Sequence, residues 1–80
     1  MQEFELASPF TGQQVGIIIK QIRELKGVTQ QTLGDAVQAG QGRVAQMENG
    51  KWGTVFENLC KMAAFCGYRV TIRFEKIEKP

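Results

Sequence analysis

Apolar side chains recur at three- and four-residue intervals along most of this chain. The first such stripe predicts an amphipathic helix from residue 12 to about residue 26, because this spacing places all its members on one helical face. Its members are Val15, Ile18, Ile19, Ile22 and Leu25. Thr11 and Gln14 have the spacing of a capping box at its start, and Gly27 suits a left-handed C-cap at its end.

Three shorter helices are expected downstream, over about residues 30–37, 41–48 and 54–66. Thr29 is a good N-cap for the first of them, and Thr54 with Glu57 forms a capping box for the last. The side chains predicted to face inward are Leu33, Ala36, Val37, Val44, Met47, Val55, Phe56, Leu59, Met62, Ala63 and Cys66. Gly34 within a helix costs ~1 kcal/mol relative to alanine. Either another helix approaches closely there, or the helix is simply weak.

From Tyr68 to Glu75 the pattern changes to strict alternation, which predicts a half-buried β-strand. Its apolar face consists of Tyr68, Val70, Ile72 and Phe74. A lone strand cannot satisfy its own backbone hydrogen bonds, so we expect it to pair with a second copy of the chain across a twofold axis. Residues 2–6 also alternate, and are either a short strand or an arm.

The chain is 80 residues long, which predicts one domain. We divide it into an N-terminal arm (1–10), a helical core (11–67) and a dimerisation strand (68–77). Its formal net charge of +2 neither requires nor excludes a nucleic-acid partner.

Composition excludes several kinds of chemistry. The chain has no histidine, so histidine-based catalysis and histidine metal ligation are absent. The spacing of Cys60 and Cys66 along a helix is unsuited to a disulfide, and we expect both to be buried, reduced thiols. No catalytic constellation, metal site or cofactor motif is present, so we expect neither an enzyme nor a cofactor. The chain lacks a membrane-spanning run and a signal peptide, which predicts a cytoplasmic protein.

The stretch from residue 29 to residue 52 carries the functional signal. Two short helices joined by a tight turn form a helix-turn-helix pattern, which can place its second helix in the major groove of DNA. The outer face of that helix offers amides, a guanidinium and small side chains: Gln41, Gly42, Arg43, Ala45 and Gln46. Glutamine can pair with adenine and arginine with guanine, so this face suits base reading.

Residues 13–66 resemble the Cro/CI/Xre family of helix-turn-helix DNA-binding domains. The matching motif is GVTQQTLGDAV, then a turn, then QGRVAQMENGK, which ends at Lys51. The resemblance implies a mostly α, lambda-repressor-like domain of four to five helices, to which the C-terminal strand adds the dimer contact.

The same resemblance implies roles for individual residues. Base-reading positions are Gln41, Gly42, Arg43 and Gln46. Phosphate-binding positions are Thr29, Gln30, Asn49 and Lys51. Arg23 and Glu48 match a pair that this family often joins as a buried salt bridge. This chain departs from the family at Gln38, where glycine is usual and the turn must tolerate a positive φ or change shape, and at Gly42, which removes a reading side chain.

A narrower resemblance covers both ends of the chain. SPFTGQQ before the first helix, and a last helix followed by glycine and YRVTIRF, look like the HipB-type antitoxins. In that group the C-terminal strands of two subunits pair. The resemblance implies a bacterial or phage-encoded repressor that binds its own palindromic operator as a homodimer and takes a kinase-like toxin as partner. The alternative is a protein-interaction module whose main role is to hold the toxin, with DNA binding secondary.

Overall fold

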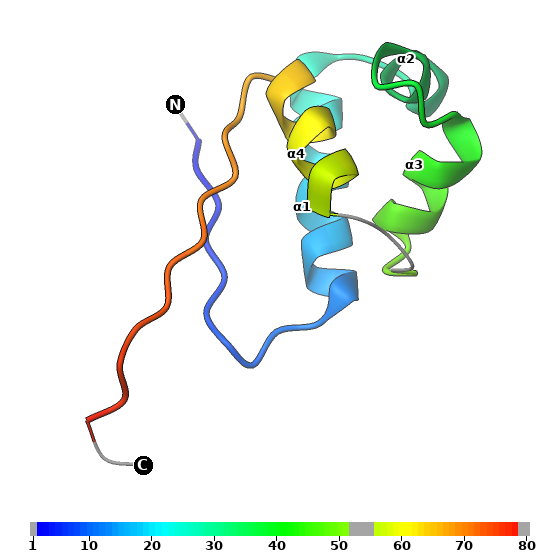
Figure 1. Cartoon of the computed structure of the whole chain (residues 1–80). Coiled ribbons are helices and arrows are strands. Elements are labelled where there is room, and N and C mark those ends of the chain that lie inside the picture. The colour runs from blue at the N-terminus through cyan, green and yellow to red at the C-terminus, as the bar shows by residue number, and fades with distance from the viewer. Residues whose placement is uncertain (1, 52–55, 79–80) are drawn as a thin grey trace.

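A computed structural model describes residues 2–51 and 56–78 of the chain. The described residues contain four α-helices: α1 (Gly12–Lys26), α2 (Gln30–Ala36), α3 (Gln41–Glu48) and α4 (Phe56–Phe65). Figure 1 shows α1 and α4 lying against each other, with α2 and α3 on one side of them and both chain ends on the other. The predictions of a mostly α fold and of four helices are confirmed.

The ends of α1 are set by the expected local chemistry. The Thr11 hydroxyl accepts the backbone N–H of Gln14 at 3.3 Å, and the Gln14 side chain accepts the N–H of Thr11 at 2.8 Å. Gly27 adopts φ +79° and donates its N–H to the carbonyl groups of Arg23 and Glu24. The predicted capping box and C-cap are therefore both present, and together they satisfy backbone groups that the helix cannot pair internally.

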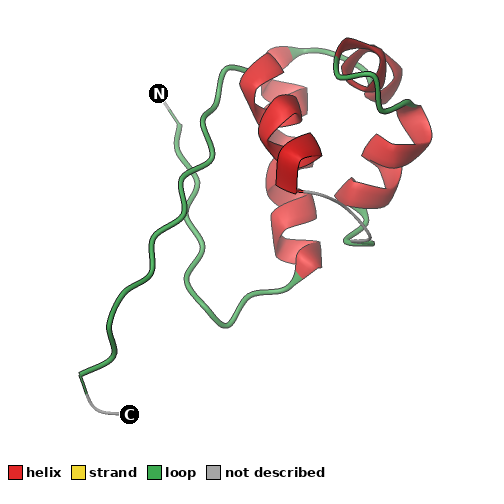
Figure 2. Cartoon of the chain, in the orientation of Figure 1, coloured by secondary structure: helices red, strands yellow, loops and turns green. Residues whose placement is uncertain are grey.

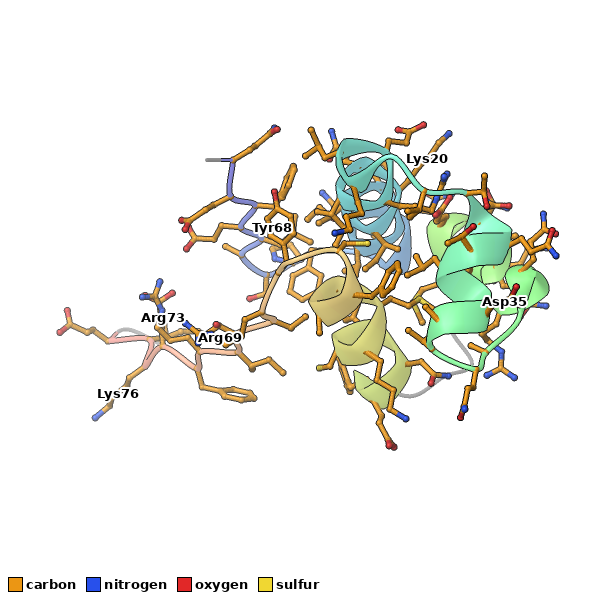
Figure 3. All side chains as sticks on the ribbon, turned by 90° about the horizontal axis from the view of Figure 1, so that it is seen from above. Lys20, Asp35, Tyr68, Arg69, Arg73 and Lys76 are labelled. Atoms are coloured by element: carbon orange, nitrogen blue, oxygen red, sulfur yellow. The ribbon has the colours of Figure 1, made fainter. Side chains whose placement is uncertain are left out.

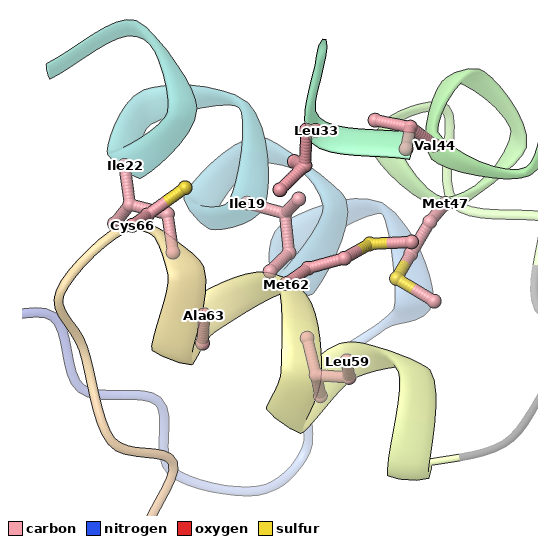
Figure 4. Packing of buried hydrophobic residues seen from close by; sticks show 9 residues of the cluster. All are labelled: Ile19, Ile22, Leu33, Val44, Met47, Leu59, Met62, Ala63 and Cys66. Carbon is pink, nitrogen blue, oxygen red and sulfur yellow. The ribbon is translucent and has the colours of Figure 1, made fainter. Parts of the chain in front are cut away.

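A single hydrophobic core holds the four helices together (Figure 4). It consists of Ile19, Ile22, Leu33, Val44, Met47, Leu59, Met62, Ala63 and Cys66. Ile19 and Ile22 belong to the apolar stripe of α1, and the other seven match the inward-facing positions predicted for the later helices, while Val15, Ile18 and Val37 pack at its border.

Three residues predicted for the core are exposed instead. Leu25 is 59% and Phe56 is 63% exposed, and Ala36 is also on the surface. Leu25 lies at the edge of its stripe, because the helix advances by about 100° per residue. Phe56 and Ala36 occupy the first position of α4 and the last of α2, where neighbouring elements cover a side chain least. The capping residue Thr54 and the core candidate Val55 lie outside the described residues.

The turn between α2 and α3 is held by a close backbone contact. A Cβ on the buried Gly34 would come closer than 3.0 Å to backbone atoms of Gly40 and Gln41. The expected close approach is therefore confirmed, although the start of α3 and the residue before it make the contact. Gln38 adopts φ +58°, so the turn keeps its shape and accepts a non-glycine residue in the left-handed region.

The described residues contain no β-strand (Figure 2), so the strand predicted for Tyr68 to Glu75 is not formed within one chain. Strand structure requires a partner for the backbone ladder, and in the described parts of this chain residues 68–75 have none. Tyr68 and Val70 still pack on the border of the core. Beyond them Ile72, Phe74 and Ile77 are 62%, 94% and 75% exposed.

Candidate nucleic-acid interface

The outward face of α3 is polar, as the sequence predicted. Gln41, Gly42, Arg43 and Gln46 are all exposed, whereas Val44 and Met47 on the opposite face are buried. Two buried residues at a spacing of three are enough to fix which side of so short a helix faces outward. The four exposed residues therefore share one solvent-facing surface.

The C-terminal end of α3 is held by a part-buried network around Glu48. Arg23 of α1 donates to both carboxylate oxygens of Glu48, through Nε at 2.6 Å and Nη2 at 3.2 Å. Arg23 Nη1 also donates to the carbonyl of Val28 at 2.9 Å, just before α2. The hydrogen bond and charge of Glu48 raise the pKa of the Arg23 guanidinium. One arginine thus links α1, the approach to α2 and the end of α3.

Gln30, a predicted phosphate ligand, belongs to the same network. Its Nε2 donates to Glu48 Oε1 at 3.0 Å. An amide nitrogen carries two hydrogens, so this bond leaves a second donor. Sequence reasoning missed this contact, because nothing in the local pattern around residue 30 points to residue 48.

Thr29, the other predicted phosphate ligand at the start of α2, serves as the helix N-cap. Its hydroxyl accepts the N–H of Thr32 at 3.0 Å and donates to the Thr32 hydroxyl at 3.0 Å. Its side chain is exposed but already hydrogen-bonded within the chain.

The loop after α3 exposes the remaining two candidates, Asn49 and Lys51. Asn49 is the C-cap residue of α3, and the Lys51 N–H donates to the carbonyl of Gln46 at 2.9 Å. Gly50 between them packs so closely on Gln13 that a Cβ there would come within 3.0 Å of it. The first turn of α1 therefore lies beside this loop, which places the exposed Gln13 next to the candidate interface.

Gly16 of α1 lies in close contact with the end of α3, and no pattern in the sequence predicted this contact. It is buried, and a Cβ there would come closer than 3.0 Å to the carbonyl oxygens of Met47 and Glu48. The backbone of α3 therefore lies directly on α1 at this point. Gly16 and the Arg23–Glu48 pair together fix how α3 sits on the body of the domain.

The two cysteines lie in different surroundings. Cys66 is buried, and burial raises the pKa of its thiol. Cys60 is exposed, so the expectation that both are buried is wrong for Cys60, which falls on the solvent side of α4.

Within residues 2–51 and 56–78, no three His, Cys, Asp or Glu side chains gather as a metal site requires. No helix in this part of the chain is long and apolar enough to cross a bilayer.

Comparison with known proteins agrees with this geometry. Residues 19–72 match the family model HTH_3, described as helix-turn-helix. The fold is similar to the crystal structure of the clp gene regulator ClgR from C. glutamicum, with a TM-score of 0.71 and 24% sequence identity. That alignment covers 82% of this chain and 85% of the ClgR chain. No curated protein sequence gives a significant match.

Proposed function

This chain belongs to the helix-turn-helix family of DNA-binding regulators, and we propose that it is a repressor that binds a palindromic operator as a homodimer. The observation that carries this proposal is the exposed polar face of α3. The Arg23–Glu48 pair holds the end of this helix, and the close packing of Gly34 on Gly40 and Gln41 holds its start. Such a face can enter a major groove without moving any buried group.

Base reading falls to Gln41, Gly42, Arg43 and Gln46. Glutamine amides can pair bidentately with adenine N6 and N7, and arginine with guanine O6 and N7. Gly42 has open space around it, so it lets the groove edge approach the helix backbone. The lack of a side chain there makes the amides and Arg43 the main sources of sequence preference.

Phosphate contacts fall to residues on both sides of this face. Lys51 and Asn49 are exposed on the loop after α3. Gln30 can give its second amide hydrogen to a phosphate oxygen while Glu48 keeps the first. Thr29 is exposed beside Gln30, at the positive end of α2. Contacts of this kind orient the domain on the duplex and are the same for all sequences.

The C-terminal segment, residues 68–78, is the part of the chain that would pair with a second copy. Its outer half exposes Ile72, Phe74 and Ile77, and an exposed apolar segment of alternating pattern is suited to pairing with its own copy. Two α3 helices related by a twofold axis would then read half-sites ~10 base pairs apart or a multiple of that distance.

The same exposed segment supports a second candidate function. A protein partner of another kind, such as a kinase-like toxin, could cover Ile72, Phe74 and Ile77 instead of a second copy. The chain would then be an antitoxin whose main role is to hold that partner. Co-expression with the product of the neighbouring reading frame tests this candidate, and separate elution of the two proteins would contradict it.

Selection of the full chain on random duplexes tests the main proposal. We expect enrichment of a sequence with twofold symmetry, and binding that weakens steeply as salt increases. Sedimentation of the free protein should give twice the mass of the chain. Equal binding to all duplexes would contradict the assignment of α3, and a monomer at all concentrations would contradict the homodimer.

A further inference from the structure

The N-terminal arm contacts Tyr68, the first residue of the C-terminal segment. The Tyr68 hydroxyl donates to the carbonyl of Gln2 at 2.8 Å. The rings of Phe4 and Tyr68 pack with their centroids 5.9 Å apart and their planes tilted by 52°. In Figure 1 the arm and the C-terminal segment run in the same general direction, on the side of the domain away from α2 and α3.

These contacts divide the C-terminal segment into two parts. Residues 68–70 form a root, in which Tyr68 and Val70 pack on the border of the core together with Phe4. From residue 71 to residue 78 every residue is exposed, and this free part includes Phe74 at 94%. The arm therefore contacts the segment at the point where it leaves the body of the domain.

Figure 3 shows the result from above: Tyr68 lies beside the arm, and the part of the segment that carries Arg73 and Lys76 projects away from the helices. Residues 71–78 are all exposed, and the Arg73–Glu75 ion pair among them joins two residues of the segment itself, so it does not hold the segment to a helix. Its direction is therefore set by its root, and the root is held between the core and the arm.

We propose that the N-terminal arm is a positioning element of the homodimer. By holding Tyr68 through Phe4 and Gln2, it fixes the direction in which residues 71–78 leave each domain to meet the second copy. Because those segments join the two domains, the arm also sets the separation of the two α3 helices, and so the preferred half-site spacing. This inference rests on the proposed dimerisation through the C-terminal segment.

Two full-length variants remove the arm contact in different ways. Tyr68→Phe deletes the hydroxyl that binds Gln2 and keeps the ring. Phe4→Ala deletes the aromatic partner and leaves Tyr68 intact. The control is Glu5→Gln, an exposed change on the same arm. Circular dichroism and thermal unfolding first establish that each variant keeps its helices.

The readouts are the dimer dissociation constant and the half-site spacing preference. Spacing is measured on the palindrome selected by the unaltered chain, with the spacer lengthened and shortened one base pair at a time. We expect Phe4→Ala to weaken dimerisation by about tenfold and to broaden the accepted spacing, with a smaller effect in the same direction for Tyr68→Phe. Glu5→Gln should match the unaltered chain. An arm that only stabilises the fold would lower the melting temperature and leave the spacing profile unchanged, which overturns the proposal.

A further variant, Ile72→Ser with Phe74→Ser, distinguishes failure of the arm inference from failure of the proposed dimerisation. If this variant is monomeric and the arm variants keep the original spacing profile, the arm inference fails and the proposed dimerisation stands. If this variant remains dimeric, the C-terminal segment is not the interface. In that case the proposed dimerisation and the arm inference both fail.

Discussion

Arg23 of α1 holds Glu48, the last residue of α3, through two hydrogen bonds of 2.6 and 3.2 Å. The Glu48 side chain is only 3% exposed, so its charge depends on Arg23 for compensation. This pair ties the candidate reading helix to the longest helix of the domain.

Arg23→Ala should destabilise the fold by roughly 3–5 kcal/mol, because it leaves a buried carboxylate without its cation. Urea unfolding followed by circular dichroism measures this loss. The double change Arg23→Met with Glu48→Leu removes both charges and should recover much of it. Equal losses in the single and double variants would contradict a coupled pair.

Gly34→Ala should destabilise the domain although alanine favours helix. The new methyl group would meet backbone atoms of Gly40 and Gln41, and such overpacking costs typically ~1–3 kcal/mol. The matched control is Gly42→Ala, where the space is open and helix propensity predicts a gain of up to ~1 kcal/mol. Thermal unfolding measures the stability of both variants. A Gly34→Ala chain more stable than the unaltered one would contradict the close approach.

Gln38→Gly should stabilise the turn between α2 and α3. A left-handed conformation costs an L-residue roughly 1–2 kcal/mol, which exceeds the ~0.5–1 kcal/mol that glycine adds to the entropy of the unfolded chain. We expect the melting temperature to rise by a few degrees, at ~4–8 °C per kcal/mol for a domain of this size. Gln31→Gly, at an exposed position within α2, should lower it instead.

Gln46→Ala and Lys51→Ala should affect DNA binding in different ways. Loss of the Gln46 amide should relax the preference at one base pair by ~1–3 kcal/mol. Loss of the Lys51 charge should weaken binding to all duplexes alike and reduce the salt slope by about one. Duplex selection and salt titration distinguish them. An unchanged base preference in Gln46→Ala would remove Gln46 from the reading surface.

Brief alkylation at about pH 8 should modify Cys60 and spare Cys66, because the first thiol is exposed and burial raises the pKa of the second. In denaturant both should react, as peptide mass spectrometry can show. The raised pKa of Cys66 stabilises the fold below the pKa of the unfolded thiol. This contribution decreases as pH rises above the pKa of the unfolded thiol, because the unfolded state then loses a proton that the folded state still holds. It is lost completely once pH passes the raised pKa of the folded thiol. In Cys66→Ala this part of the alkaline loss of stability should be absent.

The exposed face of α3 and the ends of α1 could be predicted because their causes are local. The capping pair Thr11 and Gln14, and the inward pair Val44 and Met47, act over one or two helical turns. Hydrophobic spacing alone indicates all nine core residues. It overestimated the core at Leu25 and Phe56, because periodicity does not show where the packing partners of a helix end.

The sequence by itself determined the four helices, the orientation of α3 and the residues that this helix exposes, since helical periodicity and capping need only neighbouring residues. Only the tertiary structure decided which residues distant in the sequence touch: Gly16 and the end of α3, Gln30 and Glu48, and the arm and Tyr68. These contacts join residues far apart in the chain, and no local pattern records them. The C-terminal segment shows the same limit, because a strand depends on a partner that its own alternating sequence does not supply.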